Sequence, residues 1–100
     1  MNTLPTGSFK GRAVLITGAS RGIGAALALA FAREGALVGV NFLNNAAAAD
    51  AVVARCQAEG GDAIALPADV RSPEAVRAMV DSFVAEAGRL DAVINNAFAP

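Results

Sequence analysis

Four short apolar segments alternate with three segments of helical periodicity, and this order constrains the fold more than any other feature of the sequence. The apolar segments cover residues 13–17, 36–42, 62–70 and 90–97. Runs of this length and composition are typical of strands that are buried on both faces of a sheet. Because a helix separates each strand from the next, the sequence predicts a parallel sheet with right-handed crossovers.

The segments between the strands predict three helices. In the first, apolar residues recur at intervals of three and four and are expected to share one face: Ile23, Leu27, Ala30 and Phe31. The second is the alanine-rich segment 46–61, which ends in two glycines. The third begins at the N-cap Ser72 and ends at Gly88. Its expected buried stripe consists of Val76, Met79, Val80, Phe83 and Ala87.

With helices on both faces of the sheet, this order defines a doubly wound α/β fold. Ligands of such folds bind beyond the carboxyl ends of the strands. The candidate site therefore lies in the four segments that follow the strands, which are 17–24, 41–45, 68–70 and 95–98.

Composition and charge exclude several classes of protein. The chain has 100 residues, of which 55% are hydrophobic, and we expect residues 1–100 to form part of one packed domain. No apolar stretch reaches the roughly 18 residues of a membrane span, and the amino terminus has no apolar leader, so we expect a cytoplasmic protein without a membrane partner. A net charge of −1 without a basic stripe argues against nucleic acid. Cys56 is the only cysteine and histidine is absent, which argues against a disulfide or a metal site.

The junction of the first strand and the first helix carries the stretch TGASRGIG, residues 17–24. A helix amino terminus presents unpaired N–H groups and a partial positive charge to an anion. Gly18 permits a tight turn, Gly22 leaves room for a pyrophosphate beside the backbone, and Gly24 allows close packing of the helix. The position of this turn within a strand-helix-strand unit favours dinucleotide binding over a glycine-rich loop without a ligand.

The glycine spacing resembles the cofactor-binding signature of the short-chain dehydrogenase/reductase family, in its T-G-x-x-x-G-I-G branch. The ADV of 68–70 is similar to the acidic residue that follows the third strand of that family, and GRLDAVINNA at 88–97 is similar to its fourth-strand segment ending in N-N-A-G. The resemblance covers almost the whole chain and is nearest to the 3-oxoacyl-acyl-carrier-protein reductase group. It implies a Rossmann-type sheet of which the first four strands and three helices are present.

The resemblance also implies roles for individual residues. The phosphate-binding turn would consist of Gly18, Ser20, Arg21, Gly22, Ile23 and Gly24. Asp69 would accept a hydrogen bond from the adenine amino group, with Val70 presenting main-chain atoms beside it, and the alternative is a carboxylate in the turn before the third helix. Asn95 would lie near the cofactor ribose, with Ala97 in the same segment, and the alternative there is a simple turn.

The choice of cofactor depends on the end of the second strand. NAD sites usually place an acid there, about 20 residues beyond the glycine motif, to bind the ribose 2′-hydroxyl. No acid occurs between Glu34 and Asp50, so nothing near Asn41 repels a 2′-phosphate, and Arg21 offers a guanidinium group. We therefore expect NADP rather than NAD. Two alternatives remain: Asn41 serving a 2′-hydroxyl, and Arg21 as a solvated surface residue.

The sequence departs from the family pattern at Phe98, where N-N-A-G has glycine. A phenyl ring there is expected to change substrate preference while cofactor binding is retained.

Enzymes of this family use a serine and a Tyr-x-x-x-Lys pair for catalysis. This chain has no tyrosine, and Lys10 is its only lysine, so those residues are expected beyond Pro100. We therefore expect the amino-terminal, cofactor-binding part of an oligomeric NADP(H)-dependent oxidoreductase that interconverts a small-molecule carbonyl and an alcohol, with 3-oxoacyl thioesters as one candidate substrate. The alternatives are a non-catalytic dinucleotide-binding or redox-sensing protein and an inactive fragment.

Overall fold

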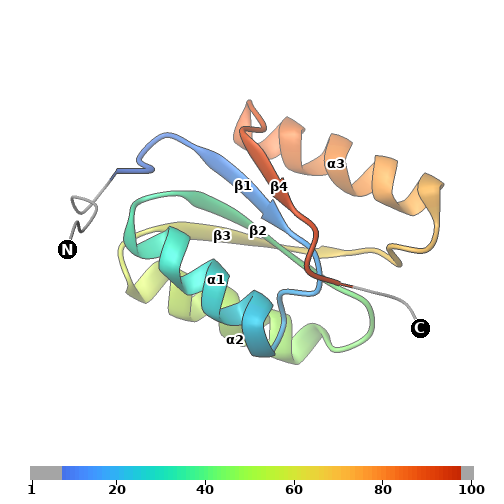
Figure 1. Ribbon diagram of the computed structural model, residues 1–100, viewed down its shortest axis with the longest axis horizontal. Coiled ribbons are helices and arrows are strands. Elements are labelled where there is room, and N and C mark those ends of the chain that lie inside the picture. The colour runs from blue at the N-terminus through green and yellow to red at the C-terminus, as the bar shows by residue number, and fades with distance from the viewer. Residues whose placement is uncertain (1–7, 98–100) are drawn as a thin grey trace.

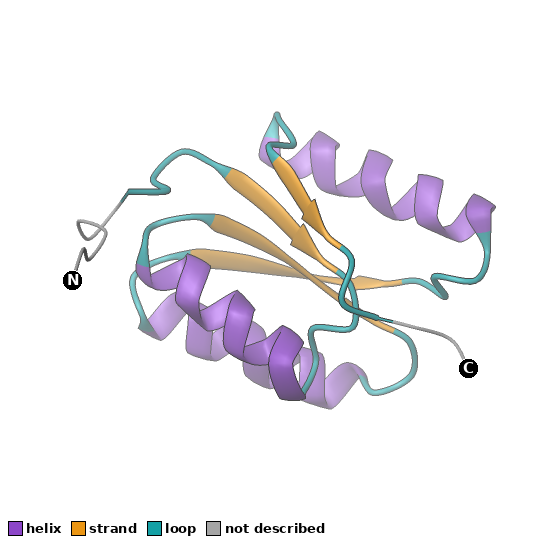
Figure 2. Cartoon of the chain, viewed as in Figure 1, coloured by secondary structure: helices purple, strands orange, loops and turns teal. Residues whose placement is uncertain are grey.

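The computed structural model describes residues 8–97 and consists of one parallel sheet with helices on both of its faces (Figures 1 and 2). The strands are β1 (Ala13–Ile16), β2 (Leu37–Phe42), β3 (Asp62–Pro67) and β4 (Ala92–Ile94), and their order across the sheet is β3-β2-β1-β4. All the pairings are parallel. The predicted doubly wound fold is therefore confirmed, with the first strand in the interior of the sheet.

The helices α1 (Gly22–Arg33) and α2 (Ala46–Ala58) cover one face of the sheet, and α3 (Pro73–Ala87) covers the other (Figure 1). Successive side chains of a strand point to opposite faces. Accordingly, Val14 and Ile16 of β1 belong to the core beneath α1 and α2, whereas Leu15 belongs to the core beneath α3. Because all four residues of β1 are buried, its sequence shows no alternation of apolar and polar residues.

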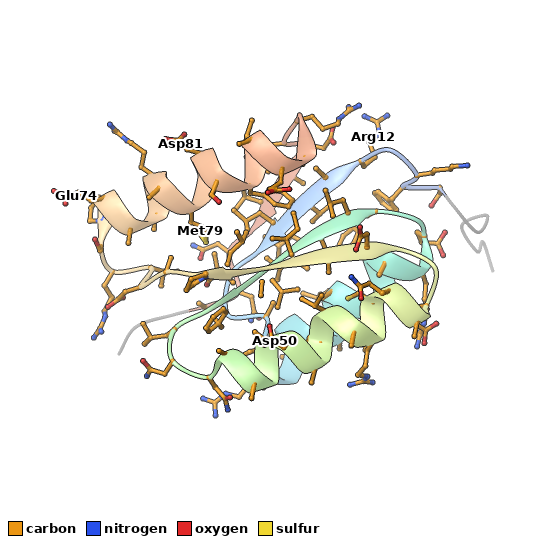
Figure 3. All side chains as sticks on the ribbon, turned by 180° about the vertical axis from the view of Figure 1, so that it is seen from behind. Arg12, Asp50, Glu74, Met79 and Asp81 are labelled. Atoms are coloured by element: carbon orange, nitrogen blue, oxygen red, sulfur yellow. The ribbon has the colours of Figure 1, made fainter. Side chains whose placement is uncertain are left out.

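The predicted stripe of α3 is confirmed. Met79 and Phe83 are buried, and the remaining members of the stripe pack against the same core while staying partly exposed: Val76, Val80 and Ala87. In Figure 3, Met79 points toward the sheet while Glu74 and Asp81 point away from it. The ring of Phe83 is fully buried and lies over Gly39 of β2, where an added Cβ would approach its Cδ1 atom to 3.2 Å.

The predicted apolar face of α1 is wrong in part. Ile23 is 73% exposed and Ala30 is exposed, whereas Leu27 and Phe31 are only partly buried. Leu27 and Phe31 still pack against the core, while the buried residues of the helix are Gly24, Ala25, Ala28, Leu29 and Ala32. Small side chains let a helix approach its neighbour closely, so the buried face of this helix consists of alanines and a glycine together with Leu29.

The remaining differences concern the ends of the strands. β3 ends at Pro67, so residues 68–70 form a loop, and β4 is shorter than the predicted segment 90–97. The edge of β4 is apolar and open, because Ala92 is exposed and Val93 is 51% exposed. Within residues 8–97, no helix has the length and apolar character needed to cross a membrane.

Candidate functional site

A pocket of about 620 Å³ lies at the carboxyl ends of the strands, where a doubly wound sheet binds its ligands. It is formed by the turn after β1, the end of β2, and the loops after β3 and β4. Its lining residues are Gly18, Ser20, Arg21, Gly22, Ile23, Asn41, Phe42, Leu43, Ala68, Asp69, Val70, Arg71, Asn96 and Ala97.

The glycine turn forms one wall of the pocket. Gly18 and Gly22 adopt φ angles of +62° and +61°, a region that side chains with a Cβ rarely adopt. A Cβ at Gly22 would project into open space, so the lack of a side chain keeps the approach to this backbone clear. Gly24 is required for a different reason. A Cβ there would collide with the carbonyl oxygen of Gly18 and would lie 2.7 Å from Asn96 Nδ2.

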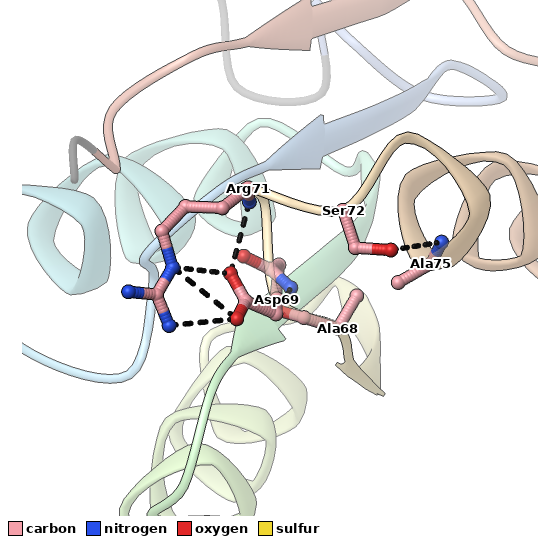
Figure 4. A network of polar contacts seen from close by, with 6 residues as sticks. Ala68, Asp69, Arg71, Ser72 and Ala75 are labelled. Atoms are coloured by element: carbon pink, nitrogen blue, oxygen red, sulfur yellow. Dashed lines mark hydrogen bonds and ion pairs between the residues drawn. The ribbon is translucent and has the colours of Figure 1, made fainter.

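The amino terminus of α1 opens on this pocket without a side-chain cap. Asn45 caps α2 by accepting a hydrogen bond from the Ala48 N–H at 3.0 Å, and Ser72 caps α3 through the Ala75 N–H at 3.2 Å (Figure 4). Arg21, at the N-cap of α1, makes no such bond, and no acid occupies the first turn. The first N–H groups of a helix have no partner within the helix. Those of α1 are therefore free to bind an anion in the pocket.

Asn41, at the end of β2, is 2% exposed and has its amide group fully engaged. Its Oδ1 accepts from the Gly18 N–H at 3.0 Å, and its Nδ2 donates to the carbonyl oxygens of Leu66 at 3.1 Å and Ala68 at 3.2 Å. The side chain thus lies beneath the pocket rather than extending into it.

Asp69 forms the opposite wall with Arg71 (Figure 4). The guanidinium donates to both carboxylate oxygens, from Nε to Oδ1 at 3.0 Å and from Nη2 to Oδ2 at 2.8 Å, and the Arg71 N–H donates to Oδ1 at 2.9 Å. These bonds, with the guanidinium bonds contributing most, lower the pKa of Asp69 to about 2. Asp69 therefore presents a permanently ionised acceptor at neutral pH.

The loop after β4 is fastened to the glycine turn by Thr17 and Asn96. Thr17 Oγ1 accepts from the N–H groups of Asn96 and Ala97, each at 2.9 Å, and Asn96 Nδ2 donates to the Gly18 carbonyl at 3.1 Å. Asn95 is exposed, and its Oδ1 accepts from Thr17 Oγ1 at 3.2 Å. Asn96 thus contacts Gly18 directly, whereas Asn95 reaches the turn only through the Thr17 hydroxyl.

The structure brings all of the predicted site residues to this pocket except Gly24, which lies beneath the turn, and Asn95. Phe98 lies outside the described residues. Sequence reasoning missed Arg71 and Asn96, although an arginine two residues after Asp69 and a second asparagine after Asn95 were visible signals. Arg21 is exposed, and no ion pair within residues 8–97 involves it. Asp69 is the only acid among the residues that line the pocket.

A parallel sheet in the order 3-2-1-4, with a glycine turn and an uncapped helix terminus at its carboxyl edge, defines a Rossmann-type nucleotide-binding architecture. Residues 12–99 match the sequence profile of the family described as short chain dehydrogenase. The chain belongs to the short-chain dehydrogenase family.

Named relatives agree with this assignment. The chain is 47% identical over 87 residues to versicolorin reductase of Emericella nidulans, covering 87% of this chain and 33% of that protein. It is 43% identical over 86 residues to the 3-oxoacyl-[acyl-carrier-protein] reductase of Staphylococcus aureus, covering 86% and 35% of the two chains. The crystal structure of a short chain dehydrogenase from Burkholderia cenocepacia in complex with NADP superposes with a TM-score of 0.87 at 44% identity, covering 92% and 38%. The chain spans about a third of the length of these relatives.

Proposed function

We propose that this chain is the cofactor-binding part of an NADP(H)-dependent oxidoreductase that interconverts a small-molecule carbonyl and an alcohol. The observation that carries the proposal is the uncapped amino terminus of α1, which meets the pocket at Gly22 beside the exposed Arg21. Anionic phosphates are the ligands that such a terminus favours. A solved relative that binds NADP supports the same assignment.

The described residues fit the adenosine and pyrophosphate half of such a cofactor. The N–H groups of the glycine turn would bind the pyrophosphate at Gly22, where a Cβ would fill the required space. Ser20 and Ile23 border the same turn. Asp69 would accept from the adenine amino group, and Val70 lines the pocket next to it. Ala97 lines the pocket, and Asn95 would act through Thr17.

Arg21 would select NADP over NAD. Its guanidinium is exposed at the pocket rim, and the end of β2 offers Asn41, Phe42 and Leu43, none of which is an acid. A guanidinium accommodates a 2′-phosphate, whereas an acid at the end of β2 would bind a 2′-hydroxyl and repel the phosphate. When bound, NADP(H) supplies the hydride for carbonyl reduction. The catalytic Ser and Tyr-x-x-x-Lys would come from residues beyond Pro100.

Titration of the full protein with NADP+ and NAD+ tests this proposal. We expect NADP+ to bind more tightly, and Arg21→Gln to weaken NADP+ by about tenfold, which corresponds to about 1.4 kcal/mol, while changing NAD+ affinity little. Arg55→Gln is the matched control, because Arg55 is also an exposed arginine but lies in the last turn of α2, outside the pocket. A wild-type protein that binds neither dinucleotide would refute the proposal, and an equal loss for both cofactors in Arg21→Gln would refute the role of Arg21.

A second assay tests the class of substrate. Two relatives are named as reductases, one of versicolorin and one of 3-oxoacyl-[acyl-carrier-protein]. We propose a carbonyl substrate, and oxidation of NADPH in the presence of a 3-oxoacyl thioester or of versicolorin would distinguish the two candidates. Binding of NADPH without turnover of any carbonyl would instead support a dinucleotide sensor.

A further inference from the structure

The side chain of Asn41 joins three parts of the sheet edge that no other side chain connects within residues 8–97. Its amide accepts from Gly18 in the glycine turn and donates to Leu66 and Ala68 on either side of the exit of β3. The next residue after Ala68 is Asp69. The two facing walls of the pocket, the glycine turn and the loop with Asp69, are thus held to the same buried group.

The chemistry of these bonds requires asparagine. One side of the group meets an N–H donor and the other meets two carbonyl acceptors, so only a side chain with one acceptor and two donors satisfies all three. The main-chain carbonyl oxygen of Asn41 also accepts a hydrogen bond from the Ala19 N–H at 2.8 Å, so the backbone of this residue contacts the same turn. At 2% exposure and with both Nδ2 protons engaged, the side chain has no donor left for a ribose hydroxyl.

We infer that Asn41 is a positioning residue, which sets the separation between the phosphate-binding turn and the adenine-binding loop without touching the cofactor through its side chain. The inference thus favours a role other than the ribose 2′-hydroxyl contact that the sequence left as an alternative. The expected effect of Asn41 on cofactor affinity rests on the proposed dinucleotide site. The three hydrogen bonds of its side chain do not depend on any ligand.

A positioning role and a direct contact predict different cofactor preferences. If Asn41 sets the distance between the walls, its replacement weakens every dinucleotide that spans them, whatever its 2′-substituent. If Asn41 contacted the ribose, its replacement would change NADP+ and NAD+ affinity by different factors. The ratio of the two dissociation constants therefore separates the two roles.

Asn41→Asp is the most informative variant, because it is nearly isosteric and still accepts from Gly18. As a carboxylate it has no donor and faces two carbonyl oxygens, and burial favours its neutral form. The protonated carboxyl donates to one of these carbonyls and restores part of the connection. The variant should therefore bind more tightly as pH falls. Ala51→Asp is the control, because Ala51 is exposed on α2, lies outside the pocket lining, and would carry an acid that stays ionised above about pH 5.

The experiment measures NADP+ and NAD+ dissociation constants of the full protein between about pH 5 and pH 8, at a temperature at which circular dichroism shows every variant folded. We expect Asn41→Asp at the upper pH to bind both cofactors at least about tenfold more weakly. At the lower pH, where the carboxyl is neutral and repels no 2′-phosphate, the variant should regain much of that affinity and show the wild-type ratio of the two dissociation constants. Wild type and Ala51→Asp should show no such recovery. A purely structural asparagine would change the free energy of unfolding but not the affinity of the folded protein.

Amide hydrogen exchange of the ligand-free wild type provides a readout that needs neither a variant nor a cofactor. The Gly18 amide should be protected, because its hydrogen is donated to a buried oxygen. The inference is overturned if the Gly18 amide exchanges at the rate of a free peptide. It is also overturned if Asn41→Asp binds both cofactors as tightly as wild type, or if only its NADP+ affinity is reduced. A wild type that binds neither dinucleotide but protects Gly18 would refute the proposed function while leaving the three bonds intact.

Discussion

Replacement of Gly24 by alanine tests how the glycine turn is packed. The added Cβ would collide with the Gly18 carbonyl oxygen, and it would lie 2.7 Å from Asn96 Nδ2 and 2.9 Å from Ala19 Cα. Two of these three atoms belong to the backbone and move only if the turn moves. The hydrogen bond from Asn96 Nδ2 to the Gly18 carbonyl, at 3.1 Å, lies in the same space and would be broken.

The expected magnitude is the sum of two opposing effects. Overpacking of a tight contact costs about 1 to 3 kcal/mol. Alanine is favoured over glycine within a helix by about 0.8 to 1 kcal/mol. We therefore expect Gly24→Ala to lower the free energy of unfolding by about 1 kcal/mol, and to weaken NADP+ binding because the turn is displaced.

Urea unfolding and NADP+ titration of the full protein measure the two effects separately. Ala26→Gly is the control, because Ala26 is exposed on the same helix and its replacement costs about 1 kcal/mol of helix propensity without reaching the turn. The two variants should be destabilised to a similar extent, but only Gly24→Ala should lose affinity. A Gly24→Ala protein that is more stable than wild type, by the amount that helix propensity alone predicts, would show that the contact with Gly18 is not as close as described.

Two further predictions concern the loop with Asp69 and the core. The pKa of Asp69 lies at about 2 in the folded protein against a usual 3.8. Its ion pair with Arg71 therefore stabilises the fold above pH 3.8, and this contribution is lost as pH falls through about 2. Arg71→Gln should be less stable than wild type at neutral pH, and the difference should disappear in acid unfolding experiments near pH 2. A difference that persists at that pH would refute the ion pair as its source. Phe83→Ala should lower the free energy of unfolding by about 3 to 5 kcal/mol in denaturant titrations, because the ring is fully buried against β2, and a loss below about 1 kcal/mol would contradict that packing.

The order of strands and helices was predictable because each element carries its own periodicity. The buried stripe of α3 followed from Met79 and Phe83, which are large and spaced four residues apart. The face of α1 followed only in part, because Leu27 and Phe31 pack against the core while Ile23 is exposed, and the residues that are buried most deeply are mainly alanines. The spacing of large apolar residues therefore identifies the buried face of a helix only when the largest side chains are also the ones that are buried.

The segments of the candidate site were predictable, but the direction of each side chain was not. Asn41, which the sequence placed near the end of the second apolar run and among the expected cofactor-binding residues, lines the pocket. Whether its amide points to a ligand or to its neighbours depends on the register of β2 with β3, in which Asn41 lies opposite Leu66, and this register is not encoded within either strand alone. The pairing of Asp69 with Arg71 likewise depends on the shape of a loop that brings residues two apart into contact.

The interior position of β1 has a consequence for the time course of folding. Among the four described strands, β1 is synthesised first, yet β4, its neighbour on one side, is synthesised last. The hydrogen bond between the Thr17 hydroxyl and the Asn96 amide joins residues 79 positions apart. Such non-local contacts form slowly, since a long segment must be ordered before they are made. A nascent chain therefore exposes one edge of β1 until β4 has left the ribosome, and the phosphate-binding turn gains its final support only at that moment.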